Sequence, residues 1–129
     1  MAEYIPVRIP GQALVAQASA AITGGQLVYV SGSGTVAPAT ANSPAWLGVA
    51  AFDAALGTDV TVHCGGTQEA VASGAITAGA LVVAAADGAV SALAAVTTPT
   101  AADVTNSRAV VGIALTTAAD NIVRVQFIR

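Results

Sequence analysis

The sequence has no lysine, a single cysteine and few aromatic residues, and only 9% of its residues are charged. An ordinary soluble domain has about 25% charged residues. The four basic residues are arginines scattered along the chain, whereas a nucleic-acid-binding surface needs clustered positive charge. One cysteine excludes a disulfide framework within the chain. We therefore predict neither nucleic-acid binding nor a disulfide-stapled fold.

A stretch without charge, residues 70–86, is the segment most similar to a membrane span. Its length is at the lower limit for a helix that crosses a bilayer. Gly74 and Gly79 interrupt it, and it consists largely of alanine, serine and threonine. We predict a strand, a turn and a second strand here, and no association with a membrane.

The only histidine and the only cysteine, His63 and Cys64, are adjacent, which suggests a thiol–imidazole pair. Neighbouring side chains in a strand point to opposite faces, so a strand at this position would separate them. We predict that Cys64 is a small buried residue and that His63 lies on a strand face or at the surface. One histidine and one cysteine also cannot supply the four ligands of a structural zinc site.

The glycine-rich residues 32–37 fit the G-x-G-x-x-(G/A) pattern of dinucleotide-binding loops. Such a loop must open a helix, but Pro38 and Pro44 follow closely, so we predict a hairpin turn instead. Aspartates favour turns because the carboxylate can hydrogen-bond to nearby backbone. Those that we assign mostly to turns and loops are Asp53, Asp59, Asp87, Asp103 and Asp120. No catalytic constellation can be assembled, and we predict a protein that is not an enzyme and uses no cofactor and no metal.

An internal repeat organises the chain. The motif that begins at residue 21, Ala-Ile-Thr-Gly-Gly-Gln-Leu-Val, returns at residue 75 as Ala-Ile-Thr-Ala-Gly-Ala-Leu-Val, 54 positions later. In both copies an apolar strand leads into a tight glycine turn and a short return strand. The second turn, Asp87-Gly88, is a strong hairpin signal because both central residues of such a turn need a positive φ.

Further along the chain, the spacing between matching residues increases from 54 to 64 positions, since Gly48 matches Gly112. The second copy therefore holds about ten extra residues, which we place between Val90 and Val110. Within them, Pro99 suits the first position of a single helical turn.

Short apolar strands separated by turns predict an all-β fold, and no segment shows the sustained 3.6-residue period of a long helix. We expect an extended N-terminal arm at residues 1–10 and a single β domain at residues 11–129. The repeat occupies approximately residues 21–63 and 75–127. The domain should be a small sandwich or β-barrel built from two similar halves, in a pseudo-twofold arrangement in which each half closes the sheet of the other.

Large apolar side chains are scarce and should mark the core. We predict that Trp46 anchors this core beside Phe52 and Phe127. The alternative is that Trp46 is exposed and anchors an interface with another protein.

The low surface charge predicts association. A soluble monomer normally protects its sheet edges with lysine, proline or inward-facing charges, and this sequence has few charges of any kind. Much of its surface should therefore be covered in the working state, by copies of itself or by a partner. The alternative explanation is that the alanine content reflects a GC-rich genome.

The N-terminal segment should be extended, because Pro6 and Pro10 exclude a helix and push each preceding residue towards an extended conformation. Its apolar content is too high for a solvated tail. It forms either the first edge strand of the domain or an arm that docks on a neighbouring subunit by strand addition. The residues that we single out for binding another protein are Tyr4, Ile5, Pro6, Val7, Arg8, Ile9 and Pro10.

The ordered motifs of the first copy are Ile-Thr-x-Gly-x-Leu-Val, a glycine turn, Val-x-Pro, Gly-Val-Ala and Val-x-Val. They occur at residues 22–28, Gly34, residues 36–38, 48–50 and 60–62. This pattern resembles the small capsid decoration, or cement, proteins of tailed bacteriophages. The resemblance covers most of the chain from about residue 11 onward.

The resemblance implies a compact β-barrel-like or β-tulip-like domain that forms a homotrimer. It also implies that the protein is made in the host cytoplasm, binds the major capsid protein on the outer surface of the phage head, and stabilises the shell at capsomer junctions. For contact with the shell we single out the arm, residues 4–10. The alternative is a β-structural module of a phage tail, a fibre or an adhesin.

Overall fold

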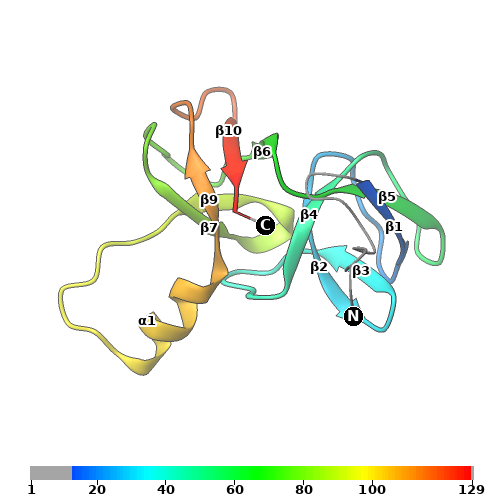
Figure 1. Cartoon of the computed structure of the whole chain (residues 1–129), viewed down its shortest axis with the longest axis horizontal. Helices are drawn as coiled ribbons and strands as arrows, with labels where there is room; N and C mark the ends of the chain where they lie inside the picture. The colour runs from blue at the N-terminus through cyan, green and yellow to red at the C-terminus, as the bar shows by residue number, and fades with distance from the viewer. Residues whose placement is uncertain (1–12, 129) are drawn as a thin grey trace, which may run out of the picture.

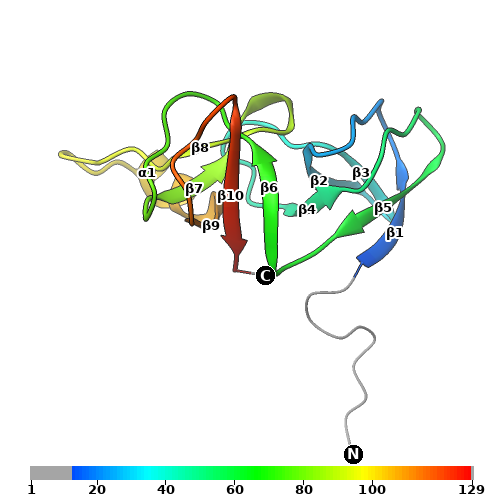
Figure 2. The same ribbon diagram turned by 90° about the horizontal axis from the view of Figure 1, so that it is seen from above.

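The structure, a computed structural model, describes residues 13–128 and consists mainly of short β-strands (Figure 1). Ten strands form two five-stranded sheets, one from each half of the chain. The two sheets lie side by side, as Figure 1 and the perpendicular view in Figure 2 show. The predicted all-β class and the two similar halves are confirmed.

The first half is a closed barrel. Its strands are β1 (Ala13–Ala18), β2 (Leu27–Gly32), β3 (Thr35–Pro38), β4 (Trp46–Ala50) and β5 (Asp59–His63). They follow the order β1-β3-β2-β4-β5 around the barrel, and the only parallel neighbours, β1 and β3, place Ala18 opposite Val36. Small and branched side chains, including Val28, Val60 and Val62, fill the interior.

The second half repeats this plan. Its strands are β6 (Thr67–Val71), β7 (Leu81–Ala84), β8 (Val90–Ala92), β9 (Val110–Ala114) and β10 (Ile122–Phe127). Followed around the barrel in the opposite direction, the first half has the order β1-β5-β4-β2-β3. The second half has the equivalent order, β6-β10-β9-β7-β8. The parallel contact that closes the first barrel is reduced here to one bridge, between Ala72 and Val90. This bridge lies 54 positions after the Ala18–Val36 pair.

Each half completes its own sheet, so the expectation that each half closes the sheet of the other is wrong. The reason is that β1 and β6, which the repeat boundaries 21–63 and 75–127 left out, supply the missing strand of each half. Backbone hydrogen bonds within the halves also correspond. The Gly25 amide donates to the Ala50 carbonyl at 2.8 Å, and the Gly79 amide donates to the Ala114 carbonyl at 2.7 Å.

The main core lies between the halves. Leu27, Trp46 and Val49 of the first half pack with the interior side chains of the second sheet. Trp46 is 1% exposed and meets the Phe127 ring edge-on, with the ring centroids 5.7 Å apart. The prediction of a core tryptophan beside Phe127 is therefore confirmed. Phe52 is wrong as a core residue, because it lies in the bend after β4 and is 48% exposed.

Two glycine positions allow adjacent strands to approach closely. A Cβ at Gly48 of β4 would collide with the His63 carbonyl oxygen of β5. A Cβ at Gly112 of β9 would collide with the Gln126 carbonyl oxygen of β10. Both strand pairs therefore depend on glycine at the same place in the repeat.

The hairpin between β7 and β8 contains η1 (Ala86–Gly88), where Asp87 and Gly88 have φ of 57° and 71°. These positive values confirm the predicted Asp-Gly turn. Between β8 and β9 the extra residues form α1 (Ala101–Asn106) and η2 (Ser107–Ala109). The helical turn is confirmed, but Thr100 is its N-cap, so Pro99 precedes the helix and is not its first residue.

Residues 70–86 form the end of β6, a turn and β7, as the sequence predicts. Within residues 13–128, the helices are too short and too polar to cross a bilayer.

Candidate interaction surfaces

The adjacent His63 and Cys64 differ in exposure. His63 is exposed at the end of β5, while Cys64 is half-buried and packs against the core of the first barrel. The Cys64 thiol donates to the Val62 carbonyl oxygen at 3.8 Å. Cys64 is thus less buried than predicted, and the two side chains lie in different surroundings.

Two of the aspartates have structural partners, and Asp59 begins β5 instead of lying in a turn. Asp53 accepts a hydrogen bond from the Gly24 amide at 2.8 Å and so fixes the turn before β2. Asp103 accepts from the Thr100 amide at 2.8 Å, and the Thr100 hydroxyl accepts from the Asp103 amide, which caps α1. Asp87 and Asp120 occupy turn positions with positive φ. Among residues 13–128, no three His, Cys, Asp or Glu side chains gather into a group that could hold a metal ion.

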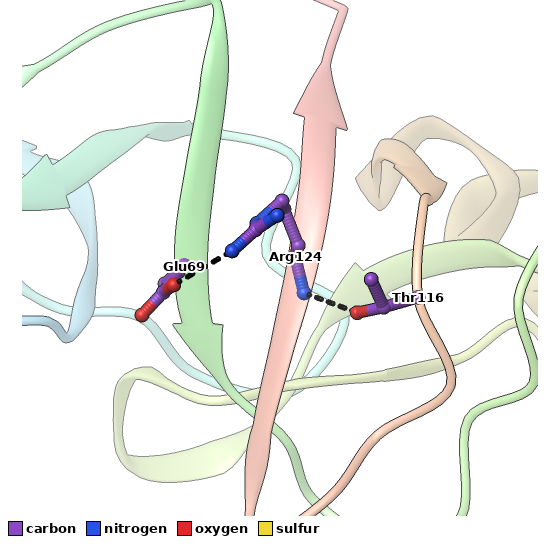
Figure 3. A network of polar contacts seen from close by, with 3 residues as sticks. All are labelled: Glu69, Thr116 and Arg124. Atoms are coloured by element: carbon purple, nitrogen blue, oxygen red, sulfur yellow. Dashed lines mark hydrogen bonds and ion pairs between the residues drawn. The ribbon is translucent and has the colours of Figure 1, made fainter.

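An exposed ion pair joins β6 and β10 across the second sheet. The Arg124 guanidinium donates to the Glu69 carboxylate at 3.3 Å, and the Arg124 amide donates to the Thr116 hydroxyl at 3.1 Å (Figure 3). Both charged side chains are more than half exposed, so water screens their attraction. The pair stabilises the strand edge weakly and presents no unpaired charge for a ligand.

A shallow pocket of about 210 Å³ lies beneath the insert, which we define as residues 93–109. Its polar side chains, Asn42, Ser91 and Asn106, come from the loop between β3 and β4, from β8 and from α1. Its one carboxylate, Asp103, is already engaged in the cap of α1. These features are typical of a gap under a loop and not of a catalytic cleft.

Exposed apolar side chains are the most distinctive surface feature, and the second half carries more of them than the first. In the first half they are Val15, Val30, Phe52 and Leu56. In the second half they are Leu81, Val96, Val104, Ile113, Leu115, Ile122 and Ile128. Large exposed apolar patches mark interaction sites on soluble proteins. This distribution agrees with the association that the low surface charge predicts.

Leu81 and Ile113 form a pair within this surface, because they lie opposite each other on β7 and β9. The sequence patterns described above do not mark this pair. A comparison with the first half identifies the pair. The corresponding residues there, Leu27 and Val49, are buried, whereas Leu81 and Ile113 are exposed.

The residues predicted to contact a partner, Tyr4 to Pro10, lie outside the residues that the structure describes. Their role therefore stays a prediction from the sequence.

Comparison with known proteins gives a family and a fold. A family model described as phage cement protein matches residues 7–127. Among solved structures, the chain is similar to the head fiber gp8.5 N base in bacteriophage phi29, with a TM-score of 0.64 and 20% sequence identity. The match covers 90% of this chain and 92% of that chain, and at this identity it is a likeness of fold. A comparison with curated proteins found no match.

Proposed function

The chain belongs to the phage cement protein family, as its motifs implied, and from this we propose that it is a capsid decoration protein. It binds the outer surface of a phage head and stabilises the shell at the junctions between capsomers. The family match over residues 7–127 carries the proposal, because it includes both halves of the repeat. The role is structural, and the use of Asp53 and Asp103 to fix a turn and a helix cap agrees with it.

The partner in this proposal is the major capsid protein, and the contact is the N-terminal arm. Two prolines favour an extended arm, and its alternating apolar residues suit the addition of a strand to a neighbouring sheet. The proposed contact residues are Tyr4, Ile5, Pro6, Val7, Arg8, Ile9 and Pro10.

The protein acts as a homotrimer in this proposal. Three linked arms hold the shell together more firmly than one, because after the first arm binds, the others bind at a high effective concentration. The exposed apolar residues of the second half support self-association.

The test uses phage heads assembled without this protein. The purified protein is added, unbound protein is removed by sedimentation, and the bound copies are counted against the major capsid protein. We expect saturable binding in a fixed ratio, and slower release of DNA on heating. A variant lacking residues 2–10 should remain trimeric and lose binding, whereas His63→Ala, at an exposed site in the first barrel, should bind normally.

Binding that is unchanged without residues 2–10 would contradict the role of the arm. Failure of the intact protein to bind heads would contradict the decoration function itself.

A second candidate is a structural module of a fibre, a tail or an adhesin. The similarity of fold to the head fiber base of phi29 favours it. Fractionation of virions separates the two candidates, because a fibre or tail module is present in few copies per particle or is recovered with tails. A decoration protein is present in numbers close to those of the shell protein.

A further inference from the structure

The two halves use the same face differently. In the first half, Leu27 of β2 lies opposite Val49 of β4, and the second half covers both, leaving them 0% and 5% exposed. The equivalent pair in the second half is Leu81 of β7 and Ile113 of β9, which are 49% and 39% exposed. Both halves therefore have this apolar face, but only the face of the first half is covered within the chain.

The insert covers only part of this face in the second half. Val83 lies two residues after Leu81 and is 4% exposed, and η2 lies against β7. Leu81 and Ile113 remain open beyond the edge of the insert, with Leu115 exposed two residues after Ile113. We call these three exposed residues, Leu81, Ile113 and Leu115, the open face.

The contact within the chain shows which segment lies at the edge of such a face. The Asp87–Gly88 hairpin of the second half lies against the start of β2. The Gly88 amide donates to the Ala39 carbonyl at 2.9 Å, and the Gln26 side-chain amide donates to the Asp87 carbonyl at 2.9 Å. The Gly88 position also lies close to the backbone of Leu27. The interior side chains of the second sheet thus cover Leu27 and Val49, and a tight hairpin closes the edge of this face at Gln26.

The equivalent hairpin of the first half has no such contact. It is the turn at Ser33 and Gly34 between β2 and β3, 54 positions before Asp87 and Gly88, and both of its residues are exposed. Gly34 has a φ of 73°, close to the 71° of Gly88. Each chain therefore presents one open face and one exposed hairpin, which is equivalent to the hairpin at the edge of the covered face.

We propose that the open face of one copy, centred on Leu81 and Ile113, receives the Ser33–Gly34 hairpin of a second copy. This contact is heterologous, because two different surfaces meet, and a heterologous contact that closes on itself produces a ring. A trimer needs such a contact, since three copies cannot be joined by a single twofold interface. The inference rests on the proposed self-association and names the surfaces that make it.

The first test measures the mass of the purified protein in solution over a range of concentrations by analytical ultracentrifugation. We expect a trimer for the natural sequence and a loss of at least tenfold in association affinity for Leu81→Glu. Val15→Glu is the matched control, because Val15 is 60% exposed on β1 of the first half and lies outside both surfaces. It should leave the trimer intact.

A trimer that persists in Leu81→Glu would overturn the inference but leave the proposed trimer standing. A natural protein that is monomeric at every concentration would overturn both. Binding to heads is measured separately, so the decoration function is judged on its own result.

The second test identifies the partner surface by cross-linking. Two variants in a Cys64→Ser background, Leu81→Cys and Ser33→Cys, are mixed and oxidised mildly, so every disulfide joins two chains. We expect a mixed dimer to form at least tenfold more than with Val15→Cys in place of Leu81→Cys. A predominance of Leu81→Cys homodimers would indicate a twofold contact and overturn the inference, as would cross-linking no higher than the control.

A third variant should strengthen the contact. The Gln26 side-chain amide donates to the hairpin within the chain. The equivalent residue beside the open face is Ala80, whose side chain has no hydrogen-bond donor. Ala80→Gln supplies the missing amide, and we expect a several-fold tighter trimer. A weaker trimer would show that the hairpin does not lie at this position.

Discussion

The two halves of this chain have the same strand order and matching backbone hydrogen bonds, yet they differ in where their apolar side chains are buried. The first half has a closed interior, and its outer face is covered at Leu27 and Val49. The second half has an interior that shares its core with the first half and an outer face that is partly open. The two copies of the fold therefore have different surroundings, and equivalent residues contribute differently to the stability of the protein.

The junction between the halves illustrates this difference. Trp46 and Phe127 pack together there, and their equivalents in the other half are Val110 and Cys64. Both equivalents are smaller and only half-buried. The large aromatic side chains are thus concentrated where the two halves meet, which makes the stability of each half depend on the other.

Removal of an aromatic side chain from the junction should have the largest effect on stability. Trp46→Ala leaves a cavity between the halves and should lower the free energy of unfolding by about 4 kcal/mol. The equivalent change, Val110→Ala, should cost about 1 kcal/mol or less because Val110 is half-buried. Urea denaturation followed by circular dichroism measures both. Equal costs for the two variants would contradict a junction that couples the halves.

Substitutions in the covered and open faces should give the next largest difference in stability. Leu27→Ala should destabilise the protein by about 3 kcal/mol, because Leu27 is fully buried. Leu81→Ala should change the stability of the monomer by less than about 0.5 kcal/mol. The measurement is made at a protein concentration low enough to prevent association, since binding between copies would stabilise the folded state. A cost at Leu81 close to that at Leu27 would show that the open face is covered within the chain.

The two glycines that allow strands to approach closely should respond alike to substitution. Gly48→Ala and Gly112→Ala each force a Cβ against a carbonyl oxygen of the neighbouring strand, and each should cost about 2 kcal/mol. Thermal unfolding of the two variants gives the comparison. If one variant were as stable as the natural protein, the strand pair concerned would not need the close approach, and the halves would differ in backbone as well as in environment.

The ion pair should have the smallest effect. Glu69 and Arg124 occupy the positions of Val15 and Thr61, so the first half forms the same strand pair without the charges. Glu69→Gln should cost less than about 0.5 kcal/mol, because the pair is exposed and screened by water. Melting temperatures at low and high salt test this. A large, salt-dependent loss would contradict a minor role for the pair.

The sequence predicted the features that depend on local chemistry. Asp87 and Gly88 were identified by their need for positive φ, and the alternation along β10 indicated its buried face. The tryptophan core position followed from the scarcity of large apolar residues. The family followed from motifs in their order along the chain.

The features that depend on contacts between distant residues were not predicted. The first strands of the halves, β1 and β6, share too few residues for the repeat to reveal them, and this led to the wrong closure of the sheets. Phe52 was placed in the core on its residue type alone, although a bend after β4 leaves it exposed. The open face was also missed, because Leu81 and Leu27 look the same in the sequence and differ only in what lies on them.

The insert has a consequence for engineering. The loop that joins the third and fourth strands is about ten residues longer in the second half than in the first, yet both halves keep the same strand order. The insert extends from the end of the molecule furthest from the first half (Figures 1 and 2). Exposed loops of this kind are the preferred sites for added sequence. Foreign peptides placed between Val96 and Thr100 should therefore be displayed without disturbing the barrel or the second sheet.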